Sequence, residues 1–179
     1  MRPRNVVLIG FMGAGKTVVG RALATHLDFR LFDTDAMVVE EAGMEIPEIW
    51  ATEGEPGFRA REEKVVLRAC AGSGHVIACG GGAILSMKNY GVLKGAGPIV
   101  YLRAPADVLR ARVDIGGEGR PLLPDDAAFG RLLVERVPIY ESAADLTIDA
   151  DAGTPEQLAS LIEQRVSDLP ERPDRTIRL

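Results

Sequence analysis

The sequence predicts an α/β protein built on a five-stranded parallel sheet with helices on both faces. Short apolar runs alternate with longer helical patterns along the chain, which is typical of βαβ units. The 179 residues suffice for one domain with a substantial core, since a chain of this length buries about 70% of its unfolded surface. Hydrophobic residues make up 46% of the chain and charged residues 26%, as in ordinary globular proteins. We therefore expect a single domain over residues 1–167.

The expected strands are short, and several expected helices begin at residues suited to a helix start. Pro56, Pro105 and Pro155 fit a first helical turn, where proline costs no hydrogen bond, and Thr154 is a suitable N-cap. The expected strands are 6–9, 30–32, 76–78, 99–102 and 146–148. The expected helices are 16–26, 36–41, 47–52, 56–71, 105–113, 126–143 and 155–167.

A phosphate-binding P-loop directly follows the first expected strand. Residues 10–17 read GFMGAGKT and match G-x-x-x-x-G-K-[ST] at each fixed position. The glycines let backbone N–H groups point inward, and the following helix adds its positive end. Lys16 is expected to reach the β- and γ-phosphates and Thr17 to hold Mg²⁺. A glycine-rich turn without a ligand is the alternative, and the full match argues against it. The expected ATP-binding residues here are Gly13, Ala14, Gly15, Lys16, Thr17 and Val18.

Two aspartates end the second expected strand. Asp33 and Asp35 stand two apart, so on an extended stretch they would face one cleft at the carboxyl edge of the sheet. Phosphoryl transfer needs one carboxylate for Mg²⁺ and another for the acceptor hydroxyl. The alternative is that one of them only caps the next helix.

Two segments break the α/β pattern. Residues 114–121 combine three glycines with charged residues between two expected helices, which is typical of a mobile surface loop. We expect a lid over about 112–124. The tail 168–179 holds two prolines and alternating charges and is expected to be frayed.

Further motifs resemble those of the shikimate kinases. The likeness runs from about residue 6 to 140, and weakly to 166, through six ordered motifs. Two are the P-loop and Asp33-Thr34-Asp35. The third is one segment with GMEIPEIW at 43–50, EGE at 53–55 and FRARE at 58–62, and the others are GGG at 80–82, RPLL at 120–123 and RVPIY at 136–140.

The resemblance implies transfer of the ATP γ-phosphate to the 3-hydroxyl of shikimate, with Mg²⁺, in the route to chorismate and the aromatic amino acids. It also implies a three-layer P-loop kinase fold like that of nucleoside monophosphate kinases, with a lid and a substrate-binding helical region over about 34–62. The residues it assigns to shikimate are Asp35, Arg59, Glu62, Gly80, Gly81, Gly82 and Arg136, with Glu62 orienting Arg59. It assigns Thr17 and Asp33 to the metal, Arg120 to the lid and the ATP phosphates, and catalysis to Asp35, Lys16 and Arg120. Whether Asp35 takes the proton or only orients the hydroxyl stays open.

The chemistry of the substrate fits these residue types. Shikimate is a carboxylate with three hydroxyls, and Arg59 and Arg136 offer two forks for a carboxylate. Solvated surface arginines, or an exposed Arg59–Glu62 pair, are the alternatives. One position departs from the family: Val113 stands where a second lid arginine is common. Arg112 is therefore left unassigned.

Composition limits the partners. A formal net charge of −5 argues against nucleic acid, and no stretch reaches the ~20 apolar residues of a membrane span. Two cysteines favour free thiols and a cytoplasmic location, and we expect a monomer. The rival functions are another small-metabolite kinase, such as a gluconate or nucleoside monophosphate kinase, and a nucleotide-binding module without catalysis.

Overall fold

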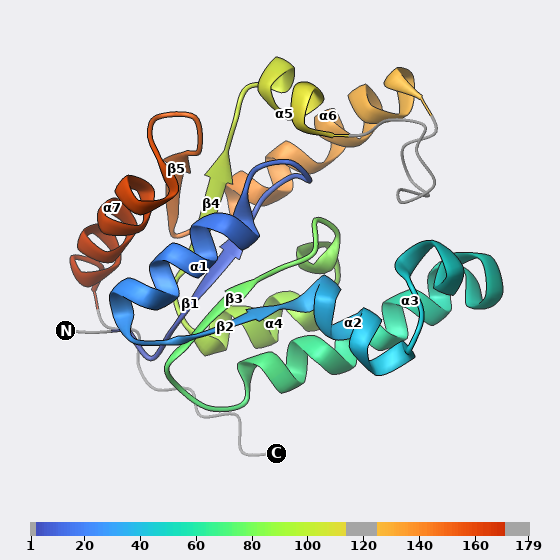
Figure 1. Ribbon diagram of the computed structural model, residues 1–179, viewed down its shortest axis with the longest axis horizontal. Helices are drawn as coiled ribbons and strands as arrows, with labels where there is room; N and C mark the ends of the chain where they lie inside the picture. Colours follow the sequence, from blue (N-terminus) through green and yellow to red (C-terminus); the bar gives the residue numbers. More distant parts are fainter. Residues whose placement is uncertain (1–2, 114–124, 171–179) are drawn as a thin grey trace.

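The computed structural model describes residues 3–113 and 125–170 and confirms the predicted layers (Figure 1). Its five strands form one parallel sheet in the order β2-β3-β1-β4-β5. The strands are β1 (Asn5–Ile9), β2 (Arg30–Asp33), β3 (His75–Ala78), β4 (Ile99–Arg103) and β5 (Leu146–Asp149). The helices are α1 (Lys16–Leu27), α2 (Thr34–Ala42), α3 (Ile46–Cys70), α4 (Met87–Ala96), α5 (Ala106–Arg112), α6 (Asp126–Ala143) and α7 (Pro155–Ser167), with a 3₁₀ turn η1 (Ala83–Leu85).

The chain crosses the sheet in both directions, which places helices on both faces. The connection from β1 to β2 runs one way along the sheet and those from β2 to β3 and from β3 to β4 run the other way. Right-handed crossovers therefore put α1 on one face and α3 and α4 on the opposite face. Helix α7 packs against α1, whereas α4 packs against α3 and α6 against η1.

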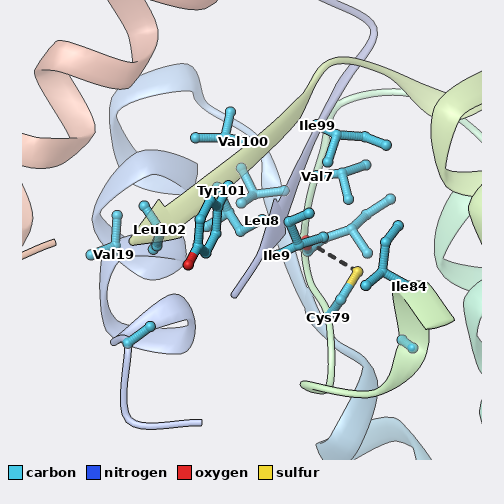
Figure 2. Packing of buried hydrophobic residues seen from close by; sticks show 14 of the residues in the cluster. Val7, Leu8, Ile9, Val19, Cys79, Ile84, Ile99, Val100, Tyr101 and Leu102 are labelled. Carbon is cyan, nitrogen blue, oxygen red and sulfur yellow. Dashed lines mark hydrogen bonds between the residues drawn. The ribbon is translucent and has the colours of Figure 1, made fainter. Parts of the chain in front are cut away.

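Strand β1 is the centre of the core. All five of its residues are buried, and it pairs with β3 on one side and β4 on the other. Figure 2 shows Val19 of α1 and Ile84 of η1 on opposite sides of this strand. A continuous apolar strand covered on both faces is what a parallel sheet requires. The P-loop therefore starts from a strand that is buried along its whole length.

The expected strands and most expected helices are confirmed, with ends that shift by one or two residues. The helices expected over 47–52 and 56–71 form α3, which is interrupted at Gly54, where φ is 68° and ψ is −177°. Thr154 caps α7 in a full capping box with Gln157. Helix α2 begins two residues before its expected start, because the Asp33 side chain caps it.

Helix α4 and η1 were not predicted. Gly91 and Gly95 lie inside α4, and each glycine costs about 1 kcal/mol of helix propensity. Packing overrides that cost: Leu93 is fully buried, and Ser86 caps the helix by accepting a hydrogen bond from the Asn89 N–H. Local propensity alone therefore missed a helix that tertiary contacts hold.

Two predicted segments fall mainly outside the described residues. Of the expected lid, only Arg112 and Val113 are described, and Arg120 lies outside. Of the expected tail, 171–179 lie outside. Within the described part, no helix is long and apolar enough to cross a membrane.

Helix α1 ends at a residue that strains the backbone. Asp28 has φ 55° in the left-handed region, and its side chain is exposed at the negative end of the helix dipole. Glycine adopts this conformation without strain and removes the unfavourable charge. Asp28→Gly should raise the free energy of unfolding in urea by about 0.5–1 kcal/mol. Asp28→Asn, which removes only the charge, should give a smaller gain. A loss of stability in Asp28→Gly would contradict this interpretation.

Candidate active site

The P-loop wraps tightly around its own lysine. Gly13 and Gly15 have φ values of 80° and 87°, which L-residues with side chains rarely adopt. The Lys16 ammonium donates hydrogen bonds of 2.9 Å to the carbonyl oxygens of Gly10 and Phe11. A Cβ at Gly10 would lie 2.6 Å from the Leu102 carbonyl oxygen, so the loop packs directly against the end of β4. The structure therefore places a positive charge at the centre of a preformed loop.

The second strand delivers Asp33 to the same place. Thr17, in the first turn of α1, donates a 2.6 Å hydrogen bond from Oγ1 to Asp33 Oδ2. The other carboxylate oxygen of Asp33 accepts from the backbone N–H groups of Asp35 and Ala36. Asp33 therefore caps α2 and also contacts Thr17, the other residue expected at the metal.

Asp35 was expected on an extended stretch together with Asp33, and that expectation is wrong. Asp35 lies in the first turn of α2. Its carboxylate still faces the site, because a Cβ on Gly80 would lie 2.2 Å from Asp35 Oδ1. The buried Thr34 side chain fixes this approach, since its Oγ1 accepts a 2.8 Å hydrogen bond from the Gly80 N–H.

The glycine triplet after β3 meets one predicted substrate residue at each position. A Cβ on Gly82 would lie 2.6 Å from Arg59 Nη1, and one on Gly81 would lie 3.6 Å from Arg136 Nη1. Side chains at Gly80 and Gly82 would therefore displace Asp35 and Arg59. The triplet brings three charged side chains from α2, α3 and α6 around one stretch of bare backbone.

The Arg59–Glu62 pair is not an exposed surface pair, because Glu62 is buried and Arg59 is only partly exposed. Arg59 Nη1 donates a 2.8 Å hydrogen bond to Glu62 Oε2, and Glu62 is 1% exposed. Burial raises the pKa of the Glu62 carboxyl, although the charge and hydrogen bond of Arg59 act to lower it. Burial alone would lower the pKa of Arg59, but Glu62 and Glu55 outweigh it and raise that pKa. Arg59 is therefore a fixed cation, braced on a second side by Glu55 at 3.2 Å.

Arg136 is also buried, at 3% exposure, on the inner side of α6. Its Nε and the Glu62 Oε1 are the buried side-chain polar atoms that lack a hydrogen-bond partner among residues 3–113 and 125–170. An unpaired buried polar group costs about 1–3 kcal/mol. One of these atoms is a donor and the other an acceptor, so a ligand with both kinds of group would satisfy them.

A hollow opens at the carboxyl ends of β4 and β5. It measures about 460 Å³ and is lined by Arg103, Ala104, Pro105, Asp149, Asp151 and Ala152. The hollow adjoins the P-loop. Its lining residue Arg103 directly follows Leu102, whose carbonyl oxygen packs against Gly10 of the P-loop. On the same side of the P-loop, Arg112 Nη1 lies 3.5 Å from the Gly13 carbonyl oxygen.

The structure thus brings together Lys16, Thr17, Asp33, Asp35, Arg59, Glu62, the glycine triplet and Arg136. Val18, expected at ATP, is half exposed on α1. Sequence reasoning missed Thr34 and Tyr140, which both hold the glycine triplet. Tyr140 belongs to the RVPIY motif and stands one helical turn after Arg136, a spacing that could have indicated a shared face.

Known proteins of one family match this chain over nearly its whole length, both in sequence and in structure. A sequence model of the shikimate kinase family matches residues 12–167. A shikimate kinase of Symbiobacterium thermophilum is 41% identical over 94% of this chain and 99% of its own length. The solved structure of shikimate kinase from Acinetobacter baumannii in complex with shikimate has a TM-score of 0.85 and 38% identity, covering 92% of this chain and 93% of that one. The shikimate kinase structure from Aquifex aeolicus has a TM-score of 0.78 and 29% identity over 91% and 96% of the two chains.

Burial of Glu62 predicts a pH-dependent stability. Because its pKa is raised above 4.5, the folded protein holds this proton to higher pH than the unfolded chain does. The stability that the protonated group contributes is present below about pH 4.5 and lost as pH rises through the folded pKa. Glu62→Gln keeps the neutral form at every pH. Its free energy of unfolding relative to wild type should therefore increase from about pH 4.5 towards neutrality.

The control is Glu63→Gln, which removes a partly exposed carboxylate that pairs with Lys88 on α4. Urea unfolding at several pH values measures both variants. A difference between Glu62→Gln and wild type that stays flat or shrinks with pH would show that Glu62 is not held in a desolvated position.

Proposed function

The chain belongs to the shikimate kinase family, and from that membership we propose how its residues divide the transfer of the ATP γ-phosphate to the 3-hydroxyl of shikimate. The acceptor is held on the β2–β3 side of the P-loop and the nucleoside on the β4–β5 side. The triphosphate lies between them on the P-loop, which follows the central strand. This arrangement is inferred from the strand order β2-β3-β1-β4-β5, because ligands of parallel sheets bind at the carboxyl ends of the strands.

The two unpaired buried atoms support the acceptor site most strongly. Arg136 Nε needs an acceptor and Glu62 Oε1 needs a donor. A hydroxylated carboxylate supplies both: its carboxylate accepts from the Arg136 fork, and one of its hydroxyls donates to Glu62. Arg59, fixed by Glu62 and Glu55, presents a second fork beside Gly82. A neutral sugar would leave the arginine forks unmatched, because it carries no anionic group.

The donor half combines Lys16 with two oxygen ligands for a metal. Thr17 Oγ1 and Asp33 Oδ2 are hard oxygen donors 2.6 Å apart, next to the loop that binds phosphate. Mg²⁺ is bound in kinases by one or two such protein oxygens together with phosphates and waters, so these residues fit it. When bound, Mg²⁺ neutralises charge on the β- and γ-phosphates. Lys16 can exchange its carbonyl contacts for phosphate oxygens without leaving the loop.

Asp35 acts on the acceptor hydroxyl. Its carboxylate accepts a hydrogen bond from the 3-hydroxyl and aims the oxygen at the γ-phosphorus. As the new O–P bond forms, the bond to the β-γ bridging oxygen breaks, ADP leaves, and the hydroxyl proton passes to Asp35. Arg120 stabilises the charge on the transferring phosphoryl group. That role rests on the RPLL motif, since Arg120 lies outside the described residues.

The hollow beside Arg103 and Asp149 suits the nucleoside. It lies on the far side of the P-loop from the acceptor residues and combines an apolar wall at Ala104 and Pro105 with charged groups. A purine ring needs flat apolar contact and a few polar partners. Arg112 lies near the same end of the loop and is proposed to flank the nucleotide.

We also propose that the chain forms one kinase domain and works as a monomer in the cytoplasm, without nucleic acid or membrane partners. The net charge of −5 and the free thiols Cys70 and Cys79 support this.

An assay of ADP release with a panel of acceptors tests the function. Shikimate should give turnover well above the ATPase background, whereas gluconate and nucleoside monophosphates should not. Turnover with one of those instead would assign the chain to a different small-metabolite kinase. ATP binding without turnover on any acceptor would indicate a nucleotide-binding module.

Replacing Asp35 separates catalysis from ATP binding. Asp35→Asn should lower kcat about 10²–10⁴-fold, because an amide accepts a hydrogen bond but cannot take the proton. The KM for ATP should stay nearly unchanged. The matched control is Asp28→Asn, the same change at the end of α1 that lies away from the P-loop. It should leave kcat unchanged. An unchanged kcat in Asp35→Asn would remove Asp35 from the chemistry.

Replacing Arg136 tests the carboxylate fork. Arg136→Lys keeps the charge but loses the bidentate geometry, so the KM for shikimate should rise roughly 10- to 100-fold. Arg131→Lys changes an exposed arginine on the same helix and should leave KM unaltered. If both variants keep the wild-type KM, Arg136 does not contact shikimate.

A further inference from the structure

Tyr140 is a fully buried polar residue to which the family motifs assigned no role. It lies on α6 one turn beyond Arg136 and has 0% exposure. Its hydroxyl donates a 2.6 Å hydrogen bond to the Gly81 carbonyl oxygen, 59 residues away in the chain. A buried phenol is thus directed at the middle glycine of the triplet.

Arg136 lies beside the same glycine, since its Nη1 would be 3.6 Å from a Cβ on Gly81. The guanidinium acts on the phenol through its charge and a side-chain hydrogen bond, and both lower the phenol pKa. Burial has the larger effect and raises the pKa of Tyr140 to about 12, so the phenol keeps its proton at neutral pH. That proton is donated to the Gly81 carbonyl oxygen, while the Arg136 cation acts on the phenol oxygen.

Packing alone does not require this hydroxyl. The Tyr140 ring packs against Tyr101 of β4 with the ring centroids 5.3 Å apart, and a phenylalanine ring would keep that contact. Figure 2 shows Tyr101 on β4 within the apolar cluster. Both contacts of the Tyr140 hydroxyl go to residues of the acceptor site, so its effect should fall on the site.

We propose that Tyr140 is a positioning residue for the acceptor, whose hydroxyl fixes the Arg136 fork at a set distance from the glycine triplet. Arg136 is buried with one unpaired nitrogen, and its Nη1 lies 3.6 Å from the position of a Cβ on Gly81. Through its hydroxyl, Tyr140 connects Gly81 to Arg136 and keeps the guanidinium of Arg136 in place before the shikimate carboxylate binds. This inference rests on the proposed role of Arg136 in binding shikimate.

The test compares Tyr140→Phe with Tyr101→Phe. Tyr140→Phe should raise the KM for shikimate about tenfold, the usual cost of losing one hydrogen bond at a charged group. The KM for ATP and the Tm should stay close to wild type. Tyr101 is buried to a similar degree, at 2% exposure, and packs on the same ring. Tyr101→Phe should leave the KM for shikimate unchanged.

A double-mutant cycle with Arg136→Lys identifies the route of the effect. If Tyr140 acts through Arg136, Tyr140→Phe should cost much less in the Arg136→Lys background than in wild type. Additive effects, equal effects of the two Tyr→Phe changes, or a Tyr140→Phe protein that is unfolded would each overturn the proposal. The last result would show that the hydroxyl supports the fold. Failure of the wild-type protein to phosphorylate shikimate would instead refute the proposed function, and the same assay reports it.

Discussion

The proposed acceptor site depends on one carboxylate that the fold keeps out of water. Glu62 is 1% exposed, and an ionised carboxyl in that position costs free energy unless cations and donors surround it. Arg59 supplies a 2.8 Å contact, and Arg136 adds positive charge. One carboxylate oxygen stays without a partner. The same arrangement therefore fixes Arg59 before any ligand arrives, so the proposed binding of shikimate requires little reordering of this side chain.

The sheet topology places the proposed acceptor and nucleoside sites on opposite sides of the P-loop, and the glycine triplet gathers the charged side chains of the acceptor site. The P-loop follows the central strand, Asp33 and the glycine triplet follow β2 and β3, and the nucleoside hollow follows β4 and β5. Parallel strands place all of these at one edge. The absence of side chains at Gly80 and Gly82 lets Asp35 and Arg59 approach the backbone. In the proposed transfer, the phosphoryl group needs to move only from the P-loop towards Asp35, in a site built largely on helices and strands.

Much of this could be predicted from local patterns, and the rest could not for identifiable reasons. The strands follow from apolar runs, and the P-loop, Arg59 and Arg136 follow from motifs with fixed spacing. Helix α4 escaped because Gly91 and Gly95 weaken its propensity and only packing restores it. Asp35 lies on a helix turn rather than on a strand, because Asp33 caps α2 and the helix begins two residues before its expected start. Thr34 and Tyr140 bind glycines 46 and 59 residues away, and local patterns do not pair residues so distant in the chain.

The most direct test of this account is a crystal structure of the protein with shikimate and ADP bound. We predict that the shikimate carboxylate lies within hydrogen-bond distance of the guanidinium groups of Arg59 and Arg136, and that the 3-hydroxyl contacts Asp35. A hydroxyl should pair with Glu62 Oε1. Shikimate bound elsewhere, or turned so that its carboxylate faces the P-loop, would contradict the account.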